Sequence, residues 1–124
     1  MIILSPPQSV RVHAEELLEA FCDRRVPESV RKEVRLDLVF RGGTATIFER
    51  RPPYVSSSVP ASDSNEWTRR SIAQFRYNAE TRRWTLYGAD RHGRWHVYDD
   101  LGPSERLEDL ITEVDADPTG IFWG

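Results

Sequence analysis

Near the start of the chain, hydrophobic residues recur every three or four positions, which is the spacing of an amphipathic helix. Between residues 9 and 25 this spacing gathers one apolar stripe, formed by Val10, Ala14, Leu17, Leu18 and Phe21. Ser9 suits the N-cap of such a helix, and Arg24 and Arg25 suit its negatively polarised C-terminal end. The pattern predicts that residues 9–25 form a helix that packs along one side.

After residue 33 the hydrophobic spacing changes from helical to alternating. Hydrophobic side chains then occupy every second position, and the alternating set is Val34, Leu36, Leu38 and Phe40. Strict alternation is typical of a half-buried β-strand. Gly42 and Gly43 permit the positive φ of a tight hairpin turn, so residues 44–51 are predicted to return as a second strand. Pro52 and Pro53 end that strand, because neither can donate to a ladder.

Three more strands are predicted between residues 69 and 100, in the segments RRSIAQFRYN, RRWTLYG and RWHVYDD. In the last two segments, alternation assigns the inner face to Trp84, Leu86, Trp95 and Val97, and the outer face to Tyr87, Arg94, His96 and Tyr98. Short turns join the segments, and short connections favour antiparallel neighbours. A five-stranded antiparallel meander is therefore expected.

A second helix is predicted over residues 102–117, starting at Pro103 and Ser104. Its apolar stripe consists of Leu107, Leu110, Ile111 and Val114. The order of elements predicts an α+β fold, with an N-terminal helix, a five-stranded antiparallel meander sheet and a C-terminal helix packed on one sheet face. These elements are expected to form a single domain over residues 1–124, since no linker divides them.

Two segments fall outside this pattern. Residues 53–66 are rich in Ser and Pro and are predicted to be a mobile loop, which could serve as a lid. The segment DPTGIFWG, residues 117–124, begins as a type I turn and ends in bulky apolar residues. It is predicted to pack as a peg against the sheet or the helices. The alternative is that Phe122 and Trp123 pack into a partner or a second subunit.

Charge is distributed unevenly along the 124 residues, whose net charge is −3. Residues 31–100 carry 13 basic and nine acidic groups, a net of +4, and the remaining residues carry four basic and 11 acidic groups, a net of −7. The favoured interpretation is that acidic ends pair with a basic middle, and the alternative is a basic face for an anion. A sequence pI near 5.6 speaks against a protein dedicated to binding nucleic acid.

The sequence gives limited indications of the compartment. Cys22 is the single cysteine, so no intramolecular disulfide can form, which fits a cytoplasmic location. The first residues lack a basic segment followed by a long apolar run, and no stretch is apolar enough to span a bilayer. We therefore expect a cytoplasmic protein with no membrane partner. Cys22 is expected to pack in a helix rather than to act as a nucleophile.

Catalytic candidates cluster in the segment DRHGRWHVYDD, residues 90–100. His96 with Asp99 or Asp100 could act as a base and its orienting carboxylate, and a metal site would need a further ligand such as Glu49 or Asp99. The strand pattern separates His92 from His96, so the helical two-histidine zinc motif does not apply. A hydrolase or nuclease centred on His96 and Asp99 is accordingly the second alternative. Neither a metal nor a cofactor is expected.

Arginine and tyrosine side chains on the polar face of the predicted sheet form the candidate binding site. The expected ligand-binding residues are Arg50, Arg76, Tyr87, Arg94, His96 and Tyr98, with Gln74 beside them. Such residues bind phosphate, carboxylate or stacked bases, but the same pairs also stabilise a solvent-exposed sheet. The favoured hypothesis is a non-enzymatic binding or interaction module, as a homodimer or with a protein partner, using this face or a sheet edge. The first alternative is binding of RNA or single-stranded DNA.

Several rare strings occur along the chain in the order FERRPP, FRYN, WTLY, WHVYDD and DPTGIFWG. In these strings the chain closely resembles a family of short bacterial proteins known only as a domain of unknown function. The resemblance runs from AFCDRRVP to the last Gly and leaves out the Ser-rich segment from Ser56 to Asn65. It implies a bacterial, single-domain protein complete in itself, and it supplies no reaction, cofactor or catalytic residue.

Overall fold

The computed structural model describes residues 6–52 and 67–124. Within these ranges the chain forms two α-helices, one short 3-10 helix and five strands. Their bounds, in chain order, are α1 Gln8–Arg25, η1 Glu28–Val30, β1 Arg35–Arg41, β2 Thr44–Arg51, β3 Thr68–Asn78, β4 Arg83–Ala89, β5 Trp95–Val97 and α2 Leu107–Ala116. The α+β fold expected from the sequence is confirmed. The predicted mobile loop at about 53–66 lies outside the described residues.

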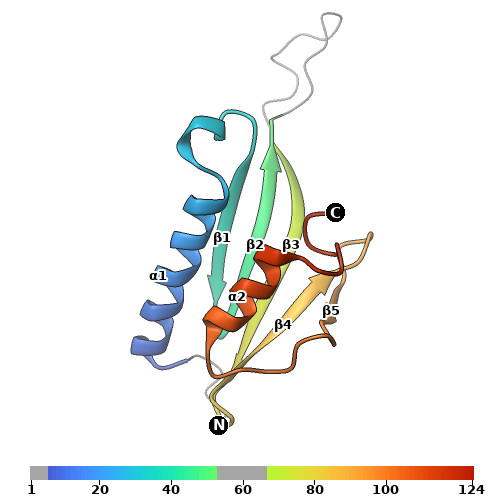
Figure 1. Cartoon of the computed structure of the whole chain (residues 1–124). Helices are drawn as coiled ribbons and strands as arrows, with labels where there is room; N and C mark the ends of the chain where they lie inside the picture. Colours follow the sequence, from blue (N-terminus) through green and yellow to red (C-terminus); the bar gives the residue numbers. More distant parts are fainter. Residues whose placement is uncertain (1–5, 53–66) are drawn as a thin grey trace, which may run out of the picture.

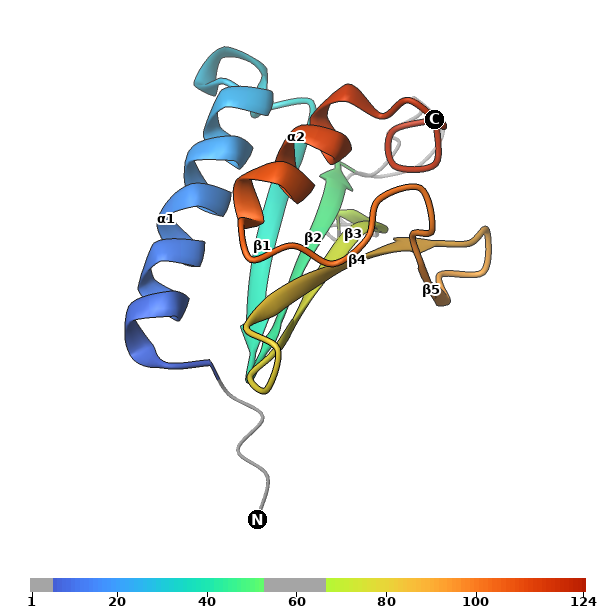
Figure 2. The same cartoon turned by 60° about the horizontal axis from the view of Figure 1, so that its bottom comes forward.

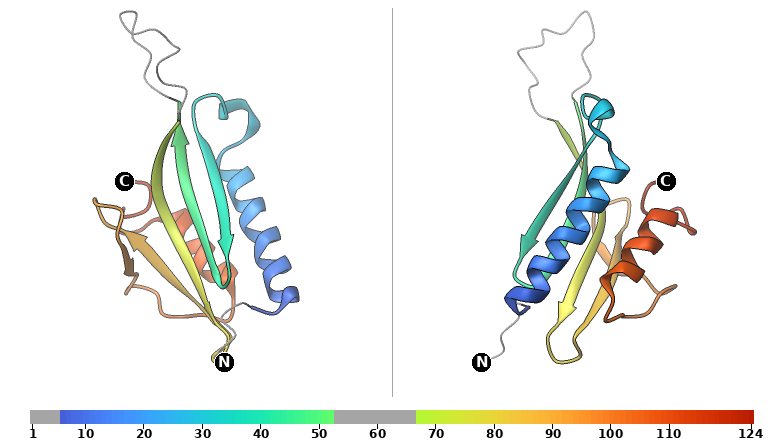
Figure 3. Two further views of the ribbon diagram at one scale, coloured as in Figure 1. Left: turned by 180° about the vertical axis from the view of Figure 1, so that it is seen from behind. Right: turned by 60° about the vertical axis from the view of Figure 1, so that its left-hand side comes forward.

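The five strands lie in one sheet in the order β1-β2-β3-β4-β5, and each pairs antiparallel with its neighbour. This is the expected meander, in which strands adjacent in sequence are adjacent in space. Figures 1 and 2 show both helices on the same side of the sheet, with α1 along β1 and α2 in front of the strands. Seen from behind in the left view of Figure 3, the other side of the sheet carries no helix among the described residues.

The side of the sheet that faces the helices, which we call the covered face, holds the hydrophobic core. The largest fully buried side chains are Phe21, Phe75, Phe122, Leu18, Ile47, Ile72, Leu86, Leu110 and Val114. They come from both helices, from the three central strands and from the last residues of the chain. The apolar stripe predicted for α2 is buried in full, and that of α1 is buried at Ala14, Leu18 and Phe21.

One residue of β3 forms a bulge that changes which side chains share a face. The pairing of β3 with β2 passes directly from Ala73 to Ser71, so Ile72 is the extra residue. Ile72 and Ala73 are both fully buried. Because of the extra residue, Arg69 and Gln74 lie on the same face although they are five positions apart.

The segment at residues 117–124 folds back onto the molecule as the predicted peg. Asp117 has a left-handed φ of 47°, and its carboxylate accepts the backbone N–H groups of Phe122 at 3.1 Å and Trp123 at 3.0 Å. Phe122 is fully buried, and the indole N–H of Trp123 donates to a backbone carbonyl of α2 at 2.8 Å. Both rings therefore pack within their own chain, whereas Ile121 stays 44% exposed.

The predicted faces of β5 are wrong. Trp95 and Val97, assigned to the inner face, lie on the side away from the helices, and Val97 is 51% exposed. Tyr98, assigned to the outer face, is buried: its ring packs on Phe122 and its hydroxyl donates to the Glu113 carboxylate at 2.6 Å. β5 has only three residues, so contacts from α2 and the last residues decide its orientation.

The predicted helix starts also need correction. Pro7 rather than Ser9 is the N-cap of α1. α2 begins at Leu107, later than predicted, because Ser104 forms a two-way backbone bridge with Trp84. A residue whose N–H and C=O are both engaged in strand-type pairing cannot also open a helix. Neither α-helix of the described residues is long and apolar enough to cross a membrane.

Candidate functional site

The side of the sheet opposite the helices, which we call the open face, collects most of the strand arginines. Antiparallel partners that lie directly opposite share a face, so the strand pairings define its members. Its arginines are Arg35, Arg41, Arg50, Arg69, Arg76 and Arg83, and its one acidic residue among the described strands is Asp37. Six positive charges against one negative charge give the open face a formal net charge of +5, although the whole chain has −3.

Three arginines of the open face lie over aromatic rings. The pairs, with the distance from guanidinium carbon to ring centroid, are Arg35–Trp67 at 4.3 Å, Arg69–Phe48 at 3.6 Å and Arg76–Tyr87 at 3.8 Å. At these distances the ring quadrupole attracts the cation. Because the rings come from β2, β4 and the residue before β3, the three pairs extend across much of the sheet.

A chain of hydrogen bonds fixes the centre of the open face. Gln74 donates from Nε2 to Oγ1 of Thr46 at 3.0 Å, and its Oε1 accepts from Nε of Arg76 at 2.7 Å. Thr46 and Gln74 are both buried although they lie on the uncovered side. Arg76 is thus held by an amide and by the Tyr87 ring, so little conformational freedom is lost when its charge meets a partner.

Arg50, one of the predicted ligand-binding residues, lies on the open face next to β1. Its Nη1 donates to Oδ2 of Asp37 at 3.2 Å. Both side chains are more than one third exposed, 38% and 44%, so the ion pair contributes little to stability. The Nε of Arg50 is buried and has no acceptor among the described residues. An unpaired buried donor is unfavourable, so this arginine is only partly satisfied in the free protein.

The predicted catalytic residues form a different arrangement from the one expected. His96 and Asp99 line one shallow hollow, but the His96 Nε2 lies 2.8 Å from Oδ2 of Asp90. That hydrogen bond, together with backbone N–H donors of the turn, lowers the pKa of the Asp90 carboxyl to about 2. Glu49 pairs instead with Arg51 at 3.1 Å. In the described part of the chain, no group of three or more His, Cys, Asp or Glu could hold a metal ion.

Cys22 packs in α1 as predicted. Burial raises the pKa of its thiol to about 12, and the nearby carboxylates of Asp23, Glu19 and Asp37 act in the same direction. The thiolate is the reactive form of cysteine, so a thiol with this pKa is a poor nucleophile at neutral pH.

The predicted ligand-binding group is divided between different parts of the structure. Arg50, Arg76 and Tyr87 lie on the open face, whereas Arg94 is in the turn before β5, His96 is at the sheet edge on the covered side and Tyr98 is in the core. Four residues of the arginine–aromatic pairs were not predicted from the sequence: Arg35, Arg69, Phe48 and Trp67. Alternation along β2 could have placed Phe48 beside Arg50, but the bulge in β3 hides the position of Arg69.

The comparisons with known proteins give a family and no activity. No curated protein and no solved structure matches the chain. A protein-family model matches residues 6–124, a range that contains both helices and all five described strands. This match confirms the resemblance that the aromatic strings indicate. The chain belongs to the family described as a domain of unknown function, DUF3024.

Proposed function

We propose that this protein is a non-enzymatic binding module that holds an anionic partner on the open face of its sheet. The observation that carries the proposal is the row of arginine–aromatic pairs on the open face: Arg35–Trp67, Arg69–Phe48 and Arg76–Tyr87. The surrounding face has a formal net charge of +5. A surface that combines guanidinium groups with flat rings suits a partner with both negative charge and flat groups.

Single-stranded RNA or DNA is the partner class that fits this chemistry best. Phosphates suit the arginines, and unpaired bases stack on aromatic rings and on guanidinium planes. The acidic character of the whole chain does not oppose this proposal, because the acids gather elsewhere. Residues 101–124, on the side of α2, carry one basic and six acidic groups. At physiological salt, charges more than about 8 Å apart are largely screened from each other at the surface.

Self-association through the open face is less favourable. Two copies would bring two faces of the same positive charge together, and like charges placed opposite each other are destabilising. The homodimer expected from the sequence therefore stays a prediction for another surface, such as the free edge of β5.

Binding of a short fluorescent uridine oligonucleotide, measured by anisotropy at increasing salt, tests the proposal. We expect the affinity to fall as salt rises, because contacts to phosphates release counterions. Replacing Arg69 and Arg76 together by Gln should weaken binding about tenfold or more. The slope of log affinity against log salt should also become less steep by about 1.4, since each lost phosphate contact accounts for about 0.7 of the slope.

Arg24→Gln is the matched control. Arg24 also lies over a ring, that of Phe21 at 5.7 Å, but it belongs to α1 on the other side of the sheet. This variant should bind as the unmodified protein does. No binding at low salt, or an equal loss in the Arg24 variant, would contradict the proposal. A poly-glutamate peptide that competes as well as the oligonucleotide would assign the open face to an acidic protein instead.

A further inference from the structure

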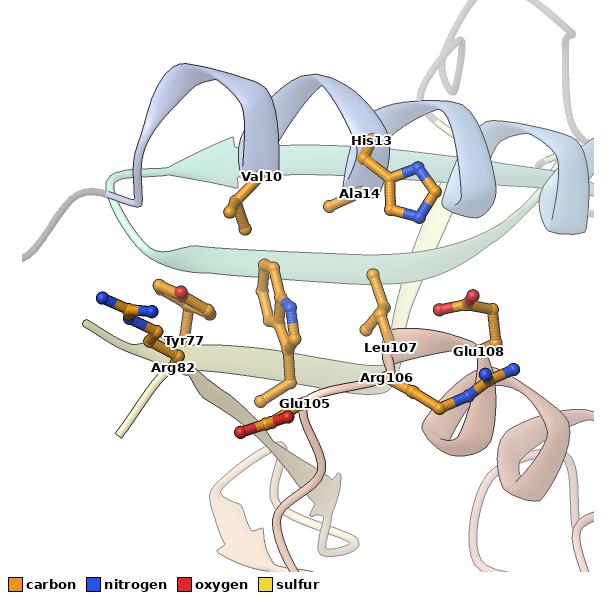
Figure 4. Close-up of a pocket in the computed structure, with 10 residues that line it drawn as sticks. Val10, His13, Ala14, Tyr77, Arg82, Glu105, Arg106, Leu107 and Glu108 are labelled. Carbon is orange, nitrogen blue, oxygen red and sulfur yellow. The ribbon is translucent and has the colours of Figure 1, made fainter. Parts of the chain in front are cut away.

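A cavity of about 420 Å³ opens on the side of the helices, away from the open face. Figure 4 shows side chains of α1, of the β3–β4 turn and of the start of α2 around it. Its apolar lining consists of Val10, Ala14, Tyr77, Trp84 and Leu107. Cavities of roughly 300–1,000 Å³ with a mainly apolar lining and a few polar groups are typical binding sites for small molecules.

The apolar lining includes a donor without an acceptor. Trp84 as a whole is 3% exposed, and its indole N–H makes no hydrogen bond with any described residue. The indole nitrogen itself is not fully buried, so the N–H is open to the cavity. The indole N–H of Trp123, by contrast, donates to the carbonyl of Val114 at 2.8 Å. The polar end of a mostly buried Trp side chain usually finds a hydrogen-bond partner. An acceptor supplied by a molecule in the cavity would complete the hydrogen bonding of Trp84.

The start of α2 supplies further free donors to the same cavity. Arg106 is the N-cap residue, and no side chain caps the helix. The backbone N–H groups of Leu107 and Glu108 have no acceptor among the described residues, and these residues line the cavity. Free N–H groups and the positive end of the helix dipole together favour a carboxylate at this point.

Arg82 brings a positive charge to the cavity from the β3–β4 turn. Its φ is 58°, a left-handed conformation that Gly or Asn adopts more easily than Arg. Its backbone N–H closes the turn by donating to the carbonyl of Asn78 at 2.8 Å. Its side chain forms no ion pair with a described carboxylate. Glycine would adopt this backbone conformation with less strain, so we interpret the arginine here as a group whose charge acts on an occupant of the cavity.

Two glutamates limit what the cavity can hold. Glu105 and Glu108 line it together with the two arginines, so a second negative charge on an occupant would be disfavoured. We propose that this cavity binds a small organic acid with an apolar body and a single carboxylate. The body lies against Trp84 and Leu107, and the carboxylate accepts from the Trp84 indole and the first N–H groups of α2. Arg82 attracts the carboxylate from the turn.

Phenylacetate is a suitable test compound, with phenylacetamide and phenethylamine as neutral and cationic controls of similar shape. The four indole N–H resonances of the protein report on binding, and Trp84→Phe identifies the resonance of Trp84. Phenylacetate should shift the Trp84 resonance in a saturable way, and the amide should bind about tenfold more weakly. The amine should leave the resonance unmoved. Equal affinity for the three compounds, or no shift with any of them, would overturn the proposal.

Two variants separate binding from folding. Trp84→Phe keeps a ring and removes the N–H, and it should weaken phenylacetate binding about fivefold or more, whereas Trp95→Phe on β5 should not. Arg82→Gly relieves the left-handed backbone, so it should keep or raise the melting temperature while it weakens binding. Unchanged affinity in both the Trp84 and Arg82 variants would contradict the site. The Arg69→Gln, Arg76→Gln protein should bind phenylacetate normally, because the open face is a separate surface.

Discussion

The two faces of this sheet are formed by alternate residues of the same strands, yet they are built in different ways. On the covered face, Ile47, Phe75 and Leu86 are fully buried under α1, α2 and Phe122. On the open face, arginines lie over aromatic rings, and no helix covers them in the described part of the chain. The covered face holds the fold together by burying apolar area. The open face holds charge in fixed positions.

Residues that stabilise the fold and residues that we propose bind the partner are adjacent along the same strand. Phe75 and Arg76 are neighbours in β3, but one is in the core and the other presents its charge to solvent. Substitutions at such neighbours should therefore have opposite consequences for unfolding and for binding. Four substitutions test this separation, and they are given in decreasing order of their effect on stability.

Phe122→Ala should have the largest effect on the covered face. The ring is fully buried and packs on Tyr98 with centroids 5.2 Å apart, so its removal leaves a cavity. We expect the free energy of unfolding to fall by about 3–5 kcal/mol, measured by urea denaturation. Ile121→Ala is the matched control, because Ile121 is 44% exposed and should cost less than about 1 kcal/mol. Similar losses of stability in both variants would contradict the burial of Phe122 in the core.

Gly88→Ala tests how closely the last residues approach β4. A Cβ at Gly88 would lie 2.7 Å from Cδ1 of Ile121 and 3.7 Å from Cε1 of Phe122. Because Cδ1 is the far end of an exposed side chain that can shift, the clash should lower the free energy of unfolding by no more than about 1 kcal/mol. Adding Ile121→Ala removes the 2.7 Å contact and should restore most of the loss in a double-mutant cycle. Strictly additive losses would show that this contact does not form in solution.

Cys22 makes the covered side sensitive to alkaline pH. Its pKa is raised from 9.0 to about 12, chiefly by burial, so the folded chain keeps a proton that the unfolded chain releases. The stabilisation is therefore complete below pH 9.0 and is lost as pH rises toward about 12. At pH 10 the loss should be about 1 kcal/mol. Cys22→Ala should lack this loss when unfolding is compared at pH 8 and pH 10, and equal pH dependence would contradict burial of the thiol.

Arg76→Gln should have the smallest effect on stability and a clear effect on the proposed binding. Its removal loses one partly exposed cation–ring contact and one hydrogen bond, so the free energy of unfolding should fall by less than about 1 kcal/mol. Oligonucleotide affinity should nevertheless fall severalfold, as anisotropy would show. A loss as large as that of Phe122→Ala would mean that the open face is structural.

The sequence predicts the fold well where a strand is long enough to show its period. β1 to β4 have seven or more residues each, which is enough to predict the meander, and alternation also predicts the two faces of β1 and β4. β5 has three residues, and its aromatic residues alternate in the wrong sense, so Trp95 is mistaken for a core residue and Tyr98 for a surface residue. What holds Tyr98 in the core is its contact with Phe122 and Glu113, which lie later in the chain.

The candidate site is predicted only in part, for a physical reason. Arg76 and Tyr87 follow from alternation and from the short β3–β4 turn, and the structure brings them together. Arg69 and Gln74 are five positions apart, and strict alternation would place them on opposite faces. They share a face only because Ile72 is an extra residue between them. A bulge reverses the alternation of side chains between the two faces, and no residue type marks its position clearly. The hydrophobic spacing alone therefore cannot assign faces to the residues before the bulge.

The position of Phe122 in the chain also sets the order in which the two faces reach their final surroundings during synthesis. All five described strands precede α2 and the last residues, so the ribosome releases the strands before the groups that complete the core. In that interval the apolar side of the nascent sheet still contacts water, which favours aggregation or capture by a chaperone. The arginine side needs no later segment of the described chain. The open face can therefore form as soon as the strands pair, whereas the covered face is complete only after α2 and residues 117–124 have packed on it.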